Sequence, residues 1–278
     1  MPKNAPLVSV LTVVRNAVDD VDATLESVRA QRFEPVEHVV VDGGSTDGTL
    51  ERLEARSEWL SSWVSEPDSG IADAMNKAGA RAGGDLLVFL GAGDTFVDEE
   101  ALARAIEAIP EGVDVRRSIL YGDAVYVHAS GTSVIRAEHE ALGERNSLCH
   151  QSVLLGRDVQ AENAYDERLN VFMDYDVWLR CLGRYPFVKL PVVISRFRAG
   201  GTSGSDALAV EMQVERTVVR LLNRQAPRTA ATVAALLGEI SSVATKRALR
   251  SAIGPNAYLR LKRLVGRDTP SVWAPPDS

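Results

Sequence analysis

The sequence predicts an α/β fold in which helices cover both faces of a mostly parallel central sheet. The main observation is that strand-like and helix-like segments alternate as β-α-β-α-β-α-β through the first half of the chain. Because parallel neighbouring strands need crossover helices, such alternation gives a three-layer sandwich. With 278 residues and 45% hydrophobic content, the chain can also bury the large core that this fold requires.

Each segment of the first half follows from the spacing of its apolar residues. The strands are runs of β-branched and apolar residues, whereas the helices repeat apolar or small residues on one face, as at Ile71, Ala74, Met75 and Ala78. The expected strands are 7–14, 36–41, 62–64 and 85–90, and the expected helices are 21–31, 46–55, 71–82 and about 99–108.

The second half is expected to be mixed rather than doubly wound. Its expected elements are an antiparallel strand pair at 118–127 and 133–136 around the Ser130-Gly131 turn, a helix at 174–184 and a strand at 187–197. From about residue 206 to 266 the chain is expected to be helical. We therefore divide the chain into an α/β body, residues 1–204, and a helical C-terminal extension, residues 205–278.

The net charge of −7 is unevenly distributed between these parts. Residues 1–215 hold 20 basic and 35 acidic side chains, whereas residues 216–278 hold 11 basic and 3 acidic ones. A basic helical tail on an acidic body indicates an anionic surface, either membrane lipid or nucleic acid. The basic positions of the tail include Arg216, Arg220 and Arg224, which are four residues apart, and later Lys246, Arg247, Arg250, Arg260, Lys262 and Arg263.

Composition also limits the compartment and the class of protein. The chain has no apolar run of 18 residues, and its start leads into a strand instead of a signal-peptide core, so we expect a cytoplasmic protein. Cys149 and Cys181 are far apart and lack a histidine cluster, which argues against a disulfide framework or a structural zinc site. Both are expected to be buried thiols.

The segment 36–48 carries the strongest functional signal. An apolar strand ends in Asp42, Gly43 and Gly44 allow a sharp turn, and the polar residues 45–47 can cap a following helix. Ligands bind at the carboxyl edge of open parallel sheets, where one carboxylate facing a glycine loop suits a nucleotide base or ribose. The alternative interpretation is a helix-capping turn without a ligand.

Four acidic residues stand where chemistry is plausible: Asp42, Asp68, Asp94 and Asp174. The first three follow strands of the parallel half, so we expect them to converge at one sheet edge, where a divalent cation bridging diphosphate oxygens would compensate their charge. Asp94, after two glycines, is the natural metal ligand, and Asp174 could accept a proton from a sugar hydroxyl. Each of Asp68, Asp94 and Asp174 could instead be a turn or helix-capping residue.

Taken in their order along the chain, the motifs resemble those of family 2 glycosyltransferases of the GT-A fold. Within this family they are most similar to the colanic-acid and exopolysaccharide type. The resemblance covers roughly residues 6–204. It rests on residues 11–17 (LTVVRNA), 40–49 (VVDGGSTDGT), 65–77 (SEPDSGIADAMNK), 84–94 (GDLLVFLGAGD), 149–152 (CHQS) and 174–180 (DYDVWLR).

The resemblance implies roles for particular residues. Asp42 would hydrogen-bond the nucleotide base, in a pocket that Thr12 and Asn16 also line, and Asp68 and Gly93 would lie at the donor. Asp94 would match the last aspartate of the metal-binding DXD motif, and Asp174 the catalytic base of the later acidic pair. Two departures reduce the cation ligands: Ala-Gly-Asp replaces the DXD motif, and Met-Asp replaces Glu-Asp.

The implied activity is inverting transfer of a sugar from a nucleotide-diphospho-sugar to a hydroxyl of a glycan or lipid-linked acceptor, assisted by Mg²⁺ or Mn²⁺. The basic tail would suit peripheral binding to the inner face of the plasma membrane, or a homodimer interface. A non-catalytic nucleotide-sugar-binding module is the alternative. A nucleotidyltransferase lacks support because no basic glycine-rich loop follows the first strand, and nucleic-acid binding lacks interleaved aromatic residues in the tail.

Overall fold

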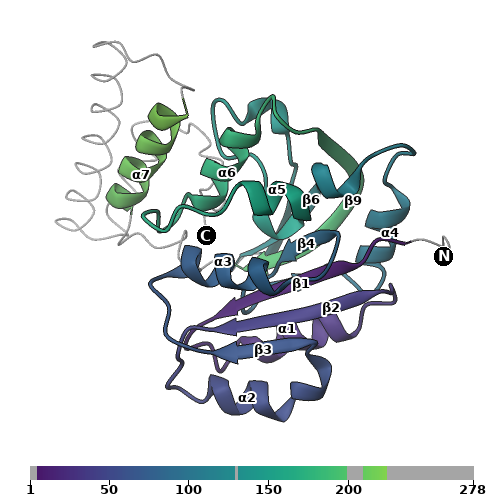
Figure 1. The fold of residues 1–278 in the computed structure, drawn as a ribbon, viewed down its shortest axis with the longest axis vertical. Helices are drawn as coiled ribbons and strands as arrows, with labels where there is room; N and C mark the ends of the chain where they lie inside the picture. Colours follow the sequence, from purple (N-terminus) through teal and green to yellow (C-terminus); the bar gives the residue numbers. More distant parts are fainter. Residues whose placement is uncertain (1–4, 129–130, 199–208, 224–278) are drawn as a thin grey trace. The chain divides into compact units, whose positions relative to one another are not determined.

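A nine-stranded mixed sheet forms the centre of the computed structural model, which describes residues 5–128, 131–198 and 209–223 (Figure 1). Its strand order is β3-β2-β1-β4-β8-β6-β9-β5, and β7 pairs with β6 off this path. The strands are β1 (Val8–Val14), β2 (Val36–Asp42), β3 (Ser62–Ser65), β4 (Leu86–Phe89), β5 (Thr95–Phe96), β6 (Ile119–His128), β7 (Gly131–Ile135), β8 (Val153–Gly156) and β9 (Phe187–Arg198).

The parallel part of the sheet is confined to the first half of the chain and to one later pair. Strands β3, β2, β1 and β4 are parallel neighbours, as the alternating pattern predicts. Strand β8 is antiparallel to both β4 and β6, β6 is parallel to β9, and β5 is antiparallel to β9. The expectation of a mixed second half is therefore confirmed.

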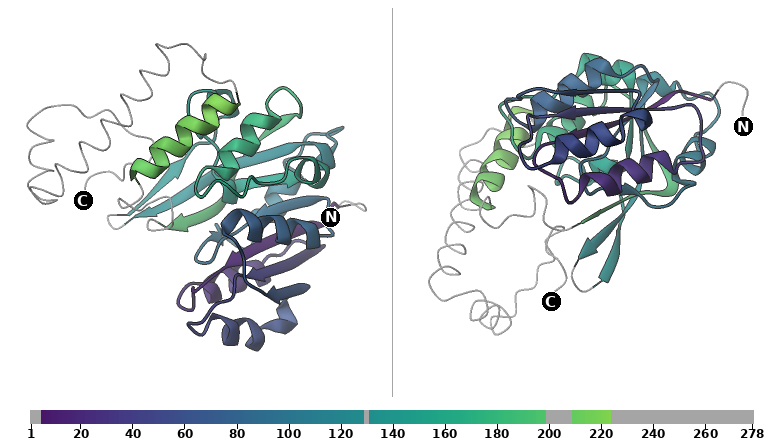
Figure 2. Two further views of the ribbon diagram at one scale, coloured as in Figure 1. Left: turned by 60° about the vertical axis from the view of Figure 1, so that its left-hand side comes forward. Right: turned by 90° about the horizontal axis from the view of Figure 1, so that it is seen from below.

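Helices cover both faces of this sheet. Figure 2 shows α1 and α3 on opposite faces. The helices are α1 (Val21–Arg29), α2 (Thr49–Ala55), α3 (Ile71–Arg81), α4 (Ala101–Glu107), α5 (Arg157–Glu162), α6 (Met173–Cys181) and α7 (Ala209–Leu222), with short 3-10 turns at Ser57–Trp59, Val115–Arg117, His139–Ala141 and His150–Ser152.

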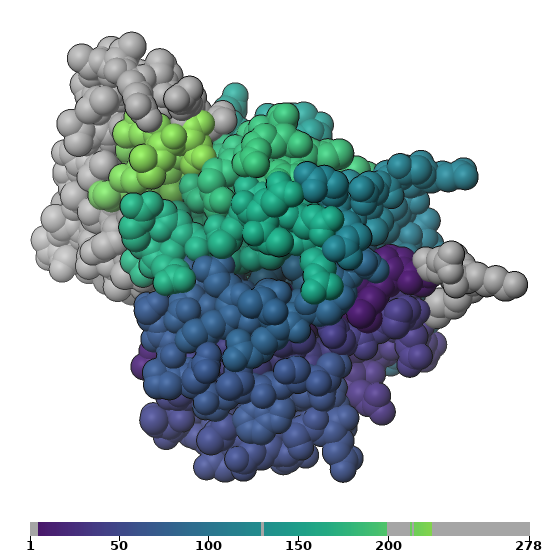
Figure 3. All heavy atoms as spheres, in the orientation of Figure 1, coloured from purple at the N-terminus to yellow at the C-terminus, as the bar shows by residue number. Residues whose placement is uncertain are grey.

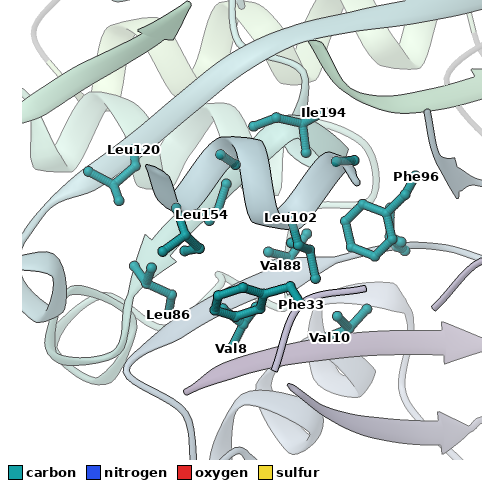
Figure 4. Packing of buried hydrophobic residues seen from close by; sticks show 14 of the residues in the cluster. Val8, Val10, Phe33, Leu86, Val88, Phe96, Leu102, Leu120, Leu154 and Ile194 are labelled. Atoms are coloured by element: carbon teal, nitrogen blue, oxygen red, sulfur yellow. The ribbon is translucent and has the colours of Figure 1, made fainter. Parts of the chain in front are cut away.

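The core beneath α1 and α4 joins the two halves of the sheet. Val8 and Val88 from the parallel strands pack in one cluster with Leu102 of α4, Leu154 of β8 and Ile194 of β9 (Figure 4). All five side chains are fully buried, so they stabilise the fold through the removal of apolar surface from water. In the space-filling view, the blue first half and the teal second half of this body meet in direct contact (Figure 3).

Several boundaries differ from the sequence-based expectations. Helix α2 begins at Thr49 rather than at residue 46, because Gly48 with φ of 101° turns the chain immediately before it. The helix expected at 174–184 begins at Met173 and ends at Cys181, close to Gly183 with φ of 73°. Strands β5 and β8 and helix α5 were not expected; they are only two to six residues long and carry little periodic signal.

The described residues of the extension form a single helix, α7. By its contacts the chain divides into one unit of Met1–Val127 and Thr132–Arg198 and a second of His128–Gly131 and Ala199–Ser278. The rest of the expected helical tail, including Arg224 and the later basic positions, lies outside the described residues. Within the described part of the chain, no helix is long and apolar enough to cross a membrane. Cys149 and Cys181 are free, buried thiols, as expected.

Candidate functional site

Three of the four acidic residues lie at one edge of the sheet. Asp42 ends β2, Asp68 follows β3 and Asp94 follows β4, and these strands run parallel to β1 between them. Because the carboxyl ends of parallel strands share an edge, the loops that carry the three residues also share it. The predicted placement at one edge is therefore seen, but among the described residues these carboxylates do not form a group of three that could hold a metal ion.

Asp42 organises the loop that follows its own strand. Its side chain is fully buried, and Oδ2 accepts hydrogen bonds from the backbone N–H groups of Gly44 (3.1 Å) and Ser45 (3.0 Å) and from the Ser65 hydroxyl (2.6 Å). Oδ1 accepts a further bond from the Ser45 hydroxyl. The carboxylate is thus paired entirely within the protein, and direct contact with a nucleotide base stays a prediction.

Asn16 fastens the β1–α1 loop to the β2–α2 loop. Its backbone is left-handed, with φ of 50°, a conformation that asparagine tolerates better than most residues. Its N–H donates to the Ser45 hydroxyl (2.8 Å), and its Oδ1 accepts from the N–H of Thr46 (2.9 Å). A second link runs from the N–H of Val18 to Asp47 (3.1 Å). The two loops are therefore held in a fixed relation at the sheet edge.

Thr12 lies deeper than the resemblance implied. Its side chain is fully buried within β1, and its hydroxyl is 2.9 Å from Nε2 of His38 on β2. Burial lowers the pKa of His38 to about 4, so the ring is neutral at physiological pH. The structure gives the Thr12 hydroxyl a partner inside the sheet, and a role in lining a nucleotide pocket stays a prediction.

Asp68 lies directly over Gly43. A Cβ atom added at Gly43 would meet Oδ2 of Asp68 at 2.0 Å, so only glycine leaves room for the carboxylate. Oδ1 of Asp68 accepts from the N–H of Gly70 (3.1 Å), immediately before α3. Arg15, whose side chain is 59% exposed, places its guanidinium 3.8 Å from the same oxygen. Asp68 thus joins the loops that follow β1, β2 and β3.

Asp94 is held in a tight turn that is anchored on α1. Its N–H donates to the carbonyl of Gly91 (3.0 Å), and Gly93 adopts φ of 90°. The fully buried hydroxyl of Thr24 lies 2.8 Å from the Asp94 carbonyl and 3.1 Å from that of Gly91, and it accepts from the N–H of Gly93 (2.9 Å). The backbone of this turn is therefore fixed by one side chain of α1.

The carboxyl group of Asp94 is poorly compensated in the protein alone. Burial, together with the negative charge of Asp20, raises its pKa to about 6, although hydrogen bonds from Gln151 Nε2 (2.9 Å) and from the backbone at Gly91 oppose the shift. Within the described residues, no three His, Cys, Asp or Glu side chains are grouped to hold a metal ion. A single uncompensated carboxylate fits a hard divalent cation that brings further oxygen ligands with it, such as those of a diphosphate.

Asp174 lies in the first turn of α6. The helix N-cap is Phe172, which excludes the helix-capping interpretation of Asp174. Oδ1 of Asp174 accepts from the N–H of Tyr175 (2.6 Å), and Asn146 Nδ2 lies 3.4 Å from Oδ1 and 3.3 Å from Oδ2. Asp174 therefore lies on α6 rather than on a sheet-edge loop, and Asn146, in the segment before β8, contacts its carboxylate.

His150 fixes that segment to the body. Its ring stacks on Phe89 of β4 at 5.0 Å between centroids, lies edge-on to Trp178 of α6 at 5.8 Å, and its Nε2 is 2.9 Å from the Tyr165 hydroxyl. Burial lowers the pKa of His150 to about 4, so the ring is neutral at physiological pH. It connects the strand before Asp94 to the helix that carries Asp174.

Four residues of the site were not singled out from the sequence. Gly43 was recognised only as a turn residue, and Thr24, Asn146 and Gln151 were given no role. Gln151 could have been noticed inside the Cys149–Ser152 motif, but Thr24 and Asn146 carry no local signal. Their partners are 28 to 70 residues away in the sequence, so their roles depend on tertiary structure.

Comparison with known proteins connects this geometry to one family. Residues 9–146 match the family described as Glycosyl transferase family 2, so this part of the chain is similar to the domain of that family. A protein of Mycobacterium tuberculosis, described as an uncharacterized glycosyltransferase, is 45% identical over 107 residues, 38% of this chain. The chain matches only 41% of that relative's length.

Two further proteins extend the similarity beyond this domain. A PGL/p-HBAD biosynthesis glycosyltransferase of Mycobacterium bovis is 28% identical over 197 residues, 69% of this chain and 74% of that protein. The mannosyltransferase of Pyrobaculum calidifontis, solved in complex with GDP-Man and Mn²⁺, superposes with a TM-score of 0.61 at 17% identity, covering 95% of this chain and 81% of that one. The fold is accordingly of the GT-A glycosyltransferase type.

Proposed function

We propose that this chain is an inverting glycosyltransferase that moves a sugar from a nucleotide-diphospho-sugar to a hydroxyl of a cell-surface glycan or glycolipid precursor. The observation that carries the proposal is the set of acidic residues at the carboxyl edge of a GT-A sheet, within a region similar to the family 2 glycosyltransferase domain. Asp94 would be the metal aspartate of the resemblance, and the burial that raises the pKa of its carboxyl group supports this role. The narrower likeness to exopolysaccharide transferases belongs to the same proposal.

The donor would bind over the fastened loops of the sheet edge. Asn16, Asp68 and Gly93 stand on the loops themselves and would contact the nucleotide and sugar, while Asp42 and Thr12 shape the floor from within the protein. Hydrogen bonding between the loops fixes their geometry before the donor arrives, which reduces the entropy cost of binding. Asp42 would therefore act on the donor indirectly, through the backbone of Gly44 and Ser45.

Asp94 would hold the divalent cation. When bound, Mg²⁺ or Mn²⁺ would neutralise charge on the departing diphosphate. Thr24 fixes the backbone of the turn, and Gln151 holds the carboxylate, so the ligand is oriented before the cation arrives. Because one carboxylate gives a weak site alone, cation affinity should depend strongly on the nucleoside diphosphate.

Asp174 would act as the general base. It takes the proton from the acceptor hydroxyl, whose oxygen forms a bond to the anomeric carbon on the face opposite the nucleotide. The bond from that carbon to the diphosphate oxygen breaks, and its electron pair leaves with the nucleoside diphosphate. Orientation of the two substrates and placement of charge supply most of the rate enhancement.

A thermal-shift screen tests the donor assignment. UDP, GDP, dTDP and their common sugar conjugates are added with and without Mn²⁺ to the full chain and to Asp94→Asn. Ligands that bind the native state raise the melting temperature by mass action. We expect one nucleotide to give a shift that Mn²⁺ enlarges in the wild type but not in the variant. No shift with any nucleotide would contradict the proposal, whereas binding without turnover would favour a non-catalytic module.

We also propose that the basic extension binds anionic membrane, with residues 205–278 acting apart from the catalytic body. Arg216 and Arg220 lie on α7, and basic residues near an anionic surface each contribute about 1 kcal/mol. Flotation with phosphatidylserine-containing and neutral liposomes tests this. Binding to the anionic liposomes alone, lost at high salt, supports the proposal, and binding to neither removes it.

A further inference from the structure

Two side-chain amides on one short segment each contact one of the two carboxylates with proposed chemical roles. Asn146 Nδ2 lies 3.3 Å from Oδ2 of Asp174, and Gln151 Nε2 lies 2.9 Å from Oδ2 of Asp94. The carboxylates come from different parts of the fold, since Asp94 follows β4 and Asp174 opens α6. The segment 146–151 is therefore a physical connection between them.

The Asn146 amide has no other hydrogen-bonding role within the described residues. The residue is 9% exposed, and its Oδ1 is buried without a hydrogen-bond partner in the part of the chain that the structure describes. Leaving such a buried carbonyl unpaired is unfavourable. A leucine would fill the same space without that cost. The amide is thus unfavourable for packing alone, and what it provides is a donor to Asp174.

The Gln151 amide has its orientation fixed from the other side. Its Oε1 is 3.1 Å from Sγ of Cys149, and burial together with the charges of Asp94 and Asp174 raises the pKa of that thiol. The thiol therefore keeps its proton and donates a hydrogen bond to Oε1. With Oε1 occupied, the N–H group of Gln151 is directed at Asp94.

The middle of the segment is packed against β4, which precedes Asp94, and against α6, which carries Asp174. Between the two amides, His150 stacks on Phe89 of β4 and contacts Trp178 of α6. Beyond them, the hydroxyl of Ser152 is 2.6 Å from that of Ser195 in β9. The segment is consequently packed against β4 and α6 and hydrogen-bonded to β9.

We propose that Asn146 and Gln151 are positioning residues for sugar transfer, with Asn146 orienting the base Asp174 and Gln151 orienting Asp94 toward the cation and diphosphate. The proposal rests on the proposed function. An N–H donor also favours the ionised carboxylate, which is the form that accepts a proton or holds a cation. Loss of a residue that orients a ligand or base in this way typically reduces affinity or activity about 10–100-fold.

Asn146→Leu tests the first half of the proposal. We expect kcat to fall about 10–100-fold while the donor KM and the nucleotide-induced thermal shift stay unchanged, because only the base is affected. The matched control is Asn163→Leu: Asn163 is also buried, but its Nδ2 donates to the backbone carbonyl of Val159 (2.8 Å). This control should lose stability without losing kcat. Equal kcat losses in both variants would overturn the assignment.

Gln151→Leu tests the second half by a binding measurement. We expect the Mn²⁺ concentration that gives the half-maximal thermal shift, at saturating nucleoside diphosphate, to rise about 10–100-fold. Asn146→Leu should leave that concentration unchanged. An unchanged Mn²⁺ midpoint in Gln151→Leu would overturn its role.

Two further measurements separate misfolding and a wrong function from a wrong position. Asn146→Ser and Gln151→Ser remove the amides with less risk to folding, and they should show the same kcat and Mn²⁺ effects if the leucine variants do not fold. Folded serine variants with wild-type kcat and Mn²⁺ midpoint would contradict the proposal. A wild-type protein that binds no nucleotide and transfers no sugar to any acceptor would overturn the proposed function, and this proposal with it.

Discussion

Replacement of Gly43 by alanine should act through one atom of Asp68. The new Cβ would stand 2.0 Å from Oδ2 and 2.9 Å from Cγ of Asp68, far inside van der Waals contact. The carboxylate must therefore move, and its hydrogen bond from the Gly70 N–H (3.1 Å) is lost. Gly43 is not among the glycines with positive φ, so alanine is tolerated by the backbone itself.

The expected cost follows from the two interactions of Asp68 that this movement breaks. A hydrogen bond to a charged group contributes about 1.5–3 kcal/mol, whereas the pair with the exposed Arg15 contributes at most about 1 kcal/mol. Alanine returns about 0.4–1 kcal/mol by restricting the unfolded chain. We expect Gly43→Ala to lower the free energy of unfolding by about 1–3 kcal/mol and to weaken donor binding.

A double-mutant cycle with Asp68→Ala isolates this collision. Asp68→Ala removes the carboxylate that the new methyl group meets, so the double variant should be about as stable as Asp68→Ala alone. Urea unfolding of the wild type, both single variants and the double variant gives the coupling energy. Gly79→Ala is the control, because its added Cβ would meet only Gln160 at ordinary contact distances of 3.4 Å or more, and it should stabilise α3. Additive losses in the cycle would refute the reasoning.

Two further substitutions probe the turn that carries Asp94. The pKa of Asp94 is about 6 in the folded protein against 3.8 ordinarily, so the folded state binds the proton more tightly than the unfolded state. The stability that this proton binding gives the fold is fully present below pH 3.8 and is lost as pH rises through 6. Asp94→Asn should therefore be more stable than wild type by up to about 3 kcal/mol at pH 8 and equal to it near pH 3.5 in urea unfolding; a difference independent of pH would contradict this. Thr24→Val removes the hydroxyl that holds Gly91, Gly93 and Asp94, and should cost about 1–3 kcal/mol and reduce the Mn²⁺ response in thermal shifts; wild-type values of both would show that the anchor is dispensable.

The parallel half of the fold could be predicted from the sequence because its signals are local. The apolar runs of β1 and β2 and the helical spacing of α3 are each contained in about ten residues. The placement of Asp42, Asp68 and Asp94 at one edge of the sheet then follows from topology alone. The short strands β5 and β8 were not predicted because a segment of two or four residues is too short to show a hydrophobic period.

The detailed site could be predicted only in part, since its contacts join distant residues. Asp42 was recognised as a strand-end carboxylate, but its saturation by Ser45 and Ser65 depends on the registry of β2 with β3. The partnership of Gln151 with Asp94 depends on how β8 pairs with β4, which reverses the parallel pattern. Such contacts are consequences of packing rather than of local sequence.

Release of nucleoside diphosphate from a nucleotide-sugar, compared between wild type and Asp174→Asn, tests the central claim most directly. The donor is the conjugate of the nucleotide that gives a thermal shift, and a panel of sugar acceptors is supplied with Mn²⁺. We predict acceptor-dependent release by the wild type and a loss of about 100-fold or more in the variant, which should still bind the nucleotide. Equal turnover by both proteins would contradict the assignment of Asp174 as the base, and no release by the wild type with any acceptor would contradict the assignment of a glycosyltransferase.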